Sequence, residues 1–142
     1  MEVAAAYIEN DNHETLCALR PHHMSLSNKW ELPGGKIKKS ETAQEALQRE
    51  ISEELDCKIA THEIICEHTH EYDTFIIQLH VIRATIIEGT PKASEHAKLI
   101  WLSKEYLDSI VWAPADIPAI EKIMKDKKVF LIARGRPFYY SD

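Results

Sequence analysis

One stretch of this chain organises the rest and reads GGKIKKSETAQEALQREISEELD, from Gly34 to Asp56. It opens with two glycines and a short basic loop, which predicts a glycine turn. Thr42 and Glu45 then have the T-x-x-E spacing of a capping box, which predicts that a helix begins near Thr42. The helical spacing of apolar residues predicts one buried side, formed by Ala43, Ala46, Leu47, Ile51 and Leu55.

The C-terminal part of this predicted helix carries three glutamates on one face. Glu50, Glu53 and Glu54 stand at i, i+3 and i+4, so their side chains project together, next to the apolar side. Like charges at this spacing repel each other, and the repulsion costs more where packing removes water. Oxygen ligands clustered in this way suit a hard divalent cation such as Mg²⁺, which would neutralise them. The pattern therefore predicts a metal site on this helix.

Length, composition and charge bound the class of protein. The 142 residues, 44% of them hydrophobic, predict one soluble domain with its own core. The formal net charge of −6 argues against binding long nucleic acid through a broad basic surface, but it leaves a nucleotide open as a ligand. No stretch has the pattern of a membrane span or a secretory leader, so we expect a cytoplasmic protein. Cys17, Cys57 and Cys66 lack zinc-site spacing and fit buried or half-buried thiols in a reducing compartment.

The rest of the chain predicts mixed strands with a few helices, in one layered α/β/α domain. Apolar runs bounded by turn residues predict strands at 2–8, 15–19, 59–66, 72–87 and 98–102, with a short extended piece at 30–32. A short helix is predicted to follow Ser103, as its N-cap, and to end near Ser109; a last helix is predicted at 114–125. Residues 129–132 form a further β-like run.

Gly35, Glu41 and the run Arg49-Glu50-Ile51-Ser52-Glu53-Glu54 are spaced as in a known signature. The stretch resembles the box of the Nudix hydrolases, G-x5-E-x7-R-E-U-x-E-E-x-G-U, in which U is a bulky apolar residue. Two positions depart, because Asp56 replaces the glycine and Cys57 replaces the final apolar residue. The glycine serves a helix end in the left-handed conformation, which Asp adopts at a cost of about 1 kcal/mol or less. Neither departure removes a metal ligand, so we expect activity to be kept and local stability to be lower.

The resemblance continues outside the box, in segments similar to MutT-type members and to their CTP-pyrophosphohydrolase relatives. These segments are Asn28–Lys36, Glu95-His96 and Trp112–Pro118. The resemblance implies the Nudix fold, an α/β (α+β) architecture in which a mixed β-sheet lies between helices. It also implies a Nudix hydrolase domain at residues 1–126, with a tail at 127–142 that belongs to the same domain and whose packing is left open.

By this resemblance, the box supplies the metal ligands and the catalytic residues. The implied ligands of Mg²⁺, or of Mn²⁺ in its place, are oxygens of Gly34, Gly35, Glu50, Glu53, Glu54 and Glu95. Glu50 or Glu54 is also implied as the general base, and Glu95 is an alternative for that role. Arg49 and Glu41 are implied to orient the carboxylates of the box rather than to react.

The residues that select the nucleotide are expected outside the box. Asp116 aligns with the position where MutT-type members bind guanine through an asparagine. When ionised, an aspartate can only accept, from a guanine or from the amino group of a cytosine; capping the last helix is its alternative role. Arg20 aligns with a pocket arginine, with a surface ion pair as the alternative. Leu32 is expected in the same pocket, and Lys36 either meets phosphate or is solvated.

These features imply a Mg²⁺-dependent hydrolase that splits (deoxy)nucleoside triphosphates into monophosphate and pyrophosphate. The expected substrates are of the 8-oxo-dGTP or (d)CTP type, so the enzyme would sanitise the nucleotide pool. Its partner is then a small nucleotide rather than a long nucleic acid or a membrane, and both a monomer and a homodimer stay open.

Particular residues favour or disfavour other activities. Tyr72 falls near a tyrosine of the members that cleave dinucleoside polyphosphates, which keeps that substrate open. ADP-ribose is less favoured, because no proline lies between Cys57 and Pro91. A nucleotide-binding module without turnover is also less favoured, because all the glutamates of the box are present. His68 and His70 alternate with Tyr72 and fit a cleft wall or plain surface better than a zinc site.

Overall fold

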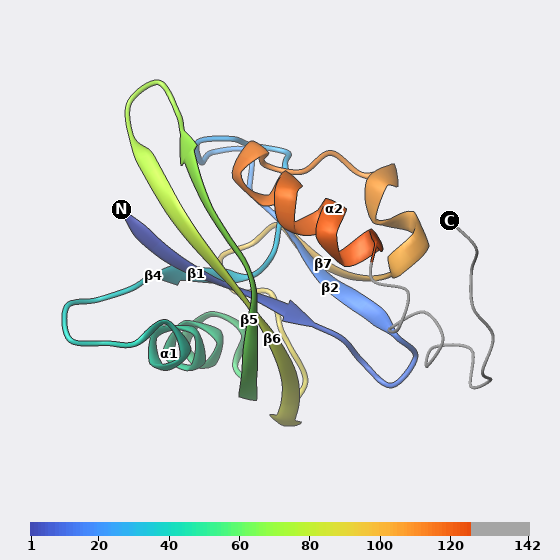
Figure 1. Cartoon of the computed structure of the whole chain (residues 1–142). Helices are drawn as coiled ribbons and strands as arrows, with labels where there is room; N and C mark the ends of the chain where they lie inside the picture. Colours follow the sequence, from blue (N-terminus) through green and yellow to red (C-terminus); the bar gives the residue numbers. More distant parts are fainter. Residues whose placement is uncertain (126–142) are drawn as a thin grey trace.

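The structure is a computed structural model, and it describes residues 1–125 (Figure 1). The strands are β1 (Glu2–Ile8), β2 (Glu14–Leu19), β3 (Trp30–Glu31), β4 (Gly34–Lys36), β5 (Lys58–Glu71), β6 (Ile76–Glu88) and β7 (Lys98–Ser103). They form a four-stranded sheet in the order β4-β1-β6-β5 and a three-stranded sheet in the order β3-β2-β7. β1 pairs with β6 in parallel, whereas the other neighbours pair antiparallel. The mixed architecture is as predicted, but the strands divide into two sheets.

Two α-helices cover opposite faces of the four-stranded sheet. They are α1 (Ala43–Leu55) and α2 (Ile117–Lys125), which Figure 1 shows on either side of the strands. Strand β1 shows why both faces are covered, because Ala4, Ala6 and Ile8 pack in the cluster that contains α1. The alternate residues Ala5 and Tyr7 pack in the cluster that contains α2. The α/β/α layering therefore follows from the period-two alternation of a strand that is apolar on both faces.

Helix α1 has the ends and the buried side that its sequence predicts. Thr42 is the N-cap: its hydroxyl accepts the Glu45 N–H at 3.1 Å, and the Glu45 carboxylate accepts the Thr42 N–H at 2.8 Å. Leu47, Ile51 and Leu55 are fully buried, together with Ala46. The helix ends at Asp56, which adopts the left-handed conformation with φ 53°. The capping box and the left-handed aspartate are both confirmed.

The segment of the two glycines is a strand and not the predicted turn. Gly34–Lys36 forms β4, which pairs antiparallel with Val3–Ala5 of β1. A Cβ at Gly34 would clash with the carbonyl oxygen of Ala4 and lie 2.8 Å from the Cα of Ala5. Gly34 is therefore needed because another backbone approaches it, and not because the chain turns there.

Other elements differ from the prediction at their ends. Strand β5 runs to Glu71, and the hairpin turn is closed by the N–H of Tyr72, which donates to the carbonyl of Phe75 at 2.8 Å. Tyr72 thus lies in the turn rather than in a strand. The helix predicted at 114–125 divides into a 3₁₀-helix, η2 (Pro114–Asp116), and α2. The helix after Ser103 is also 3₁₀, η1 (Lys104–Ser109), and the Ser103 side chain makes no capping bond.

The remaining sequence predictions concern the C-terminal residues, the cysteines and membrane-spanning segments. The β-like run at 129–132 and the tail at 127–142 lie outside the described residues. Cys17 and Cys57 are buried free thiols and Cys66 is a half-buried one, as predicted. Within residues 1–125, no helix combines the length and the apolar character needed to cross a membrane.

Candidate active site

A cavity of about 420 Å³ brings together residues that are far apart in the sequence. Its volume is in the range of small-molecule sites. Eight of the residues expected in the site line it, namely Arg20, Leu32, Gly34, Gly35, Lys36, Glu54, Glu95 and Asp116. The other four expected residues are connected to this lining through contacts of α1. They are Glu41, Arg49, Glu50 and Glu53.

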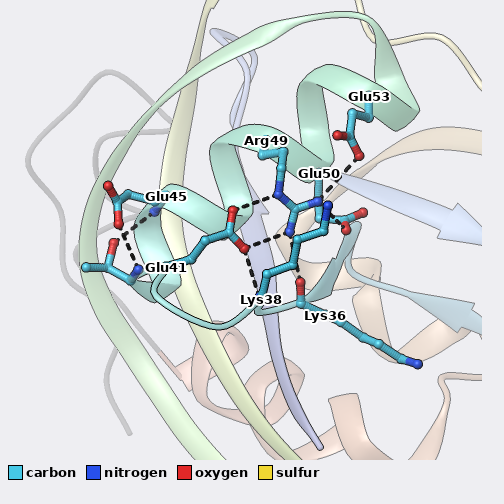
Figure 2. Close-up of polar contacts among 8 residues, drawn as sticks. Lys36, Lys38, Glu41, Glu45, Arg49, Glu50 and Glu53 are labelled. Carbon is cyan, nitrogen blue, oxygen red and sulfur yellow. Dashed lines mark hydrogen bonds and ion pairs between the residues drawn. The ribbon is translucent and has the colours of Figure 1, made fainter.

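Arg49 lies at the centre of the carboxylates of the box (Figure 2). Its guanidinium donates to both oxygens of Glu41, at 2.7 and 2.9 Å, and to Glu50 at 2.9 Å. It also donates to the carbonyl of Lys36 at 3.0 Å and approaches Glu53 at 3.4 Å. These bonds to Arg49 are the main reason that the pKa of Glu41 is lowered to about 2. One arginine thus joins the start of α1, its carboxylate face and β4.

Glu50 and Glu54 form a close acidic pair, in which Glu50 also accepts from Arg49. Burial, and after it the neighbouring Glu50 carboxylate, raise the pKa of Glu54 to about 8. Glu50 packs directly on Gly35, because a Cβ there would overlap its carboxylate. Two close carboxyl groups beside a bare backbone are a donor set that suits a hard divalent cation. Glu95 lines the cavity on the same side and adds negative charge near Glu54.

The implied metal ligands are not all gathered in one place. Glu53 is 58% exposed and is absent from the cavity lining, and its carboxylate is turned towards Arg49 (Figure 2). Within the described residues, no group of three acidic, histidine or cysteine side chains is arranged to hold a metal as it stands. Glu50, Glu54 and the glycine backbone fit a metal ion, whereas Glu53 must rotate away from Arg49 to join them.

Asp116 also lines the cavity and is 6% exposed. Its carboxyl accepts the Leu32 N–H at 2.9 Å, a bond that joins two residues of the cavity lining and does not cap α2. The segment before η2 is aligned by β3, because Trp30 exchanges backbone hydrogen bonds of 2.8 Å with Val111 and Ala113. Burial, followed by the charge of Glu31, raises the pKa of Asp116 to about 8. A protonated carboxyl can donate as well as accept, so Asp116 is not restricted to accepting at neutral pH.

Two residues of the cavity, Glu31 and His96, were not proposed as site residues from the sequence. Glu31 accepts from Arg20 Nη1 at 2.9 Å and lies 2.7 Å from His96 Nε2. Arg20 therefore forms an ion pair, one of its two expected roles, and it also lines the cavity. The only sequence signal was that Glu31 and His96 fall in segments similar to MutT-type members.

Aromatic side chains form the wall near η2. The Tyr72 hydroxyl accepts the N–H of Ala115 at 3.0 Å, and the rings of Tyr72 and Phe75 lie 5.0 Å apart. His70 stacks edge-on against Tyr72 at 4.5 Å, and His68 follows at 5.9 Å from His70. Tyr72 and Phe75 line the cavity. Of the three residues expected as a cleft wall or plain surface, Tyr72 lines the cavity, whereas His68 and His70 are not part of its lining.

The cavity is lined by an acidic residue of α1 and by a buried carboxyl from η2, in a volume that suits a small molecule. The sequence comparison gives the family: the chain belongs to the Nudix family, since the model of the NUDIX domain matches residues 4–122.

Relatives and solved structures agree with this assignment. The chain is 39% identical to the CTP pyrophosphohydrolase of Escherichia coli K12 over 124 residues, which are 87% of this chain and 91% of the relative. It is 29% identical to the 8-oxo-dGTP diphosphatase of the same strain, over 88% of this chain and 97% of the relative. The solution structure of a MutT protein from methicillin-resistant Staphylococcus aureus 252 superposes with a TM-score of 0.73 at 44% identity, over 89% of this chain and 96% of that one.

Proposed function

We propose that this protein hydrolyses nucleoside triphosphates, or their deoxy forms, to a nucleoside monophosphate and pyrophosphate. The observation that supports this best is the pair of Glu50, which packs on Gly35, and Glu54, which lines a nucleotide-sized cavity. The names of the relatives support the same class of substrate, because they act on CTP or on 8-oxo-dGTP.

The residues of the box have separate tasks in this proposal. Nudix hydrolases use a divalent metal, and we assign Mg²⁺ here, with Mn²⁺ as a substitute. When bound, the metal would supply neutralisation of phosphate charge and activation of a water. Glu50, Glu53, Glu54 and a carbonyl of Gly34 or Gly35 would hold it, and Glu53 would have to leave Arg49 to do so. Either Glu50 or Glu54 would accept the proton of the water.

Other residues of the chain hold the box and the triphosphate in place. Arg49 keeps the carboxylates in register through its bonds to Glu41 and Glu50. Lys36 lines the cavity beside the two glycines, where its ammonium group is suited to a phosphate.

The base is selected at the opposite side of the cavity. The protonated Asp116 offers a donor and an acceptor. Glu31, whose oxygens are bonded to Arg20 and His96, lines the same cavity. A group that both donates and accepts fits the edge of cytosine and the edge of guanine, because each carries an amino and a carbonyl group. We propose (d)CTP as the first candidate substrate and 8-oxo-dGTP as the second, because the chain is 39% identical to the CTP pyrophosphohydrolase and 29% identical to the 8-oxo-dGTP diphosphatase. Leu32 and Tyr72 supply apolar surface for the ring.

A dinucleoside polyphosphate is a second candidate substrate, because Tyr72 lines the cavity. The products distinguish it, since its cleavage gives two nucleotides and no free pyrophosphate. We further propose that the reaction takes place in the cytoplasm, where the three free thiols stay reduced.

The test is a substrate panel with Mg²⁺ that contains canonical and oxidised nucleoside triphosphates, ADP-ribose and diadenosine polyphosphates. We expect Glu53→Gln and Glu54→Gln to abolish pyrophosphate release while the circular dichroism spectrum is unchanged. Glu121→Gln, an exposed position on α2, is the matched control and should leave the rate unchanged. Full turnover in both variants of the box would contradict the metal assignment.

A second variant tests selection of the base. Asp116→Ala should bring the kcat/KM values of the different bases close together, because the residue that discriminates among them is gone. If the ranking of substrates survives this substitution, Asp116 does not read the base.

A further inference from the structure

The loop that carries Glu95 is attached to the rest of the site at several points. The N–H of Lys92 donates to the carbonyl of Leu55 at 2.9 Å, and the hydroxyl of Ser94 donates to the carbonyl of Glu54. At the other end, the N–H of Ala97 donates to the carbonyl of Leu19 at 2.9 Å. Residues 92–97 therefore bridge the end of α1 and the end of β2.

His96 provides the side-chain attachment of this loop. Its Nε2 lies 2.7 Å from Oε2 of Glu31, and its side chain is 8% exposed. Because an ionised carboxylate only accepts, Nε2 carries a proton and donates. The other ring nitrogen, Nδ1, is buried and has no hydrogen-bond partner within residues 1–125. Nε2 of the imidazole is thus bonded to Glu31 and Nδ1 is buried, so the ring holds the loop in place and does not react.

Glu95 lies between the two attached side chains of the loop. Ser94 fixes the preceding residue to the helix end that carries Glu54, and His96 fixes the following residue to Glu31. The Glu95 side chain is exposed itself and lines the cavity with Glu54. Within residues 1–125 the Glu95 carboxylate makes no hydrogen bond or ion pair, so its neighbours in the chain must set its direction.

We propose that His96 is a positioning residue that holds Glu95 beside Glu54, with Glu31 as its anchor. The inference rests on the proposed function, because it gives Glu95 a part in the hydrolysis. One imidazole then fixes two carboxylates relative to each other. These are Glu31, which borders the base, and Glu95, which borders the acidic face of α1.

The experiment compares turnover in three variants. His96→Leu removes the donor, and we expect kcat to fall about ten- to a hundred-fold while KM changes little. His96→Gln keeps an N–H donor at a similar reach, so it should restore most of kcat. In the Glu95→Gln background, His96→Leu should cost nothing further, because the residue that it positions is already disabled. An equal loss in both backgrounds, or a loss in KM alone, would overturn the proposal.

A second measurement does not depend on turnover. Amide hydrogen exchange at Lys92 and Ala97 should become faster in His96→Leu and stay as in the wild type in His96→Gln, and unchanged exchange in both variants would contradict the anchoring. His80→Leu is the matched control, because His80 is 11% exposed and pairs with Glu2 and Glu67 outside the cavity. It should change neither kcat nor exchange in the loop. A wild-type chain that releases no pyrophosphate would refute the proposed function, while the exchange data would still decide the role of His96.

Discussion

At the scale of single residues, Asp116 shows how its location changes the chemistry of a carboxyl group. Its pKa is raised to about 8, mainly by burial and then by the charge of Glu31, whereas an aspartate in an unfolded chain titrates near 4. Between these two values the folded state holds one proton more than the unfolded state. The free energy of unfolding must therefore fall as the pH rises through this window, by at most about 1.4 kcal/mol per pH unit.

We expect Asp116→Asn to remove this contribution to the pH dependence of stability. The amide oxygen still accepts the Leu32 N–H, and no charge is buried at high pH. Urea unfolding between about pH 5 and 8 should show a shallower fall in the variant than in the wild type. Asp108→Asn, an exposed position on η1, is the control and should follow the wild-type curve. Parallel curves for the wild type and Asp116→Asn would refute the assigned burial of a proton.

The two adjacent glycines of β4 should respond differently to the same substitution. In Gly34→Ala the new Cβ meets backbone atoms of Ala4 and Ala5, which cannot move without shifting the sheet. We expect a loss of about 3 kcal/mol or more in stability. In Gly35→Ala the Cβ meets the end of the Glu50 side chain, which can move.

Gly35→Ala should therefore keep the fold and lose about ten- to a hundred-fold in kcat, because a displaced Glu50 no longer faces Glu54. Thermal unfolding and steady-state kinetics on both variants separate the two effects. Equal losses of stability in Gly34→Ala and Gly35→Ala would show that the contrast is wrong.

At the scale of elements, α1 shows what a local pattern can predict. Its start, its buried side and its left-handed end depend on residues within a few positions of each other, and all three were predicted. Strand β4 was not, because Gly34 is required by contact with β1, about thirty positions earlier in the chain. The site likewise combines a part that a local pattern predicts with a part that depends on distant contacts. The box was predicted from its spacing, but the contacts of Glu31 with Arg20 and His96 depend on tertiary packing.

The left-handed conformation at the end of α1 lowers the stability of the fold, and one substitution should remove this loss. Asp56 holds φ 53°, a conformation that glycine adopts without strain. Its ion pair with Lys92 is 4.0 Å long between two exposed side chains and contributes little. We expect Asp56→Gly to raise the free energy of unfolding by about 0.5–1 kcal/mol and to leave kcat unchanged. Chemical denaturation checks the first expectation, and a decrease in stability would contradict it.

At the scale of the whole molecule, the cavity is assembled from both sheets and from segments on either side of them. The acidic face of α1 contributes one part, and β3 with η2 contributes the other. A ligand that binds only this assembled state stabilises the entire fold by mass action.

Added Mg²⁺ should therefore raise the temperature of unfolding, because it binds the Glu50–Glu54 pair of the folded chain. At a hundred times its Kd, the expected stabilisation is about 2.7 kcal/mol. Calorimetry with and without a chelator measures it, and Glu54→Gln should abolish most of the effect. A shift of the same size in Glu54→Gln would place the cation elsewhere on the molecule.

The bond from Leu32 to Asp116 spans 84 positions of the chain. During synthesis, α1 with its acidic face leaves the ribosome long before the segment that carries Asp116. Among residues 1–125, Asp116 is the last in chain order that lines the cavity. The cavity is therefore complete only when nearly all of the described residues have been synthesised.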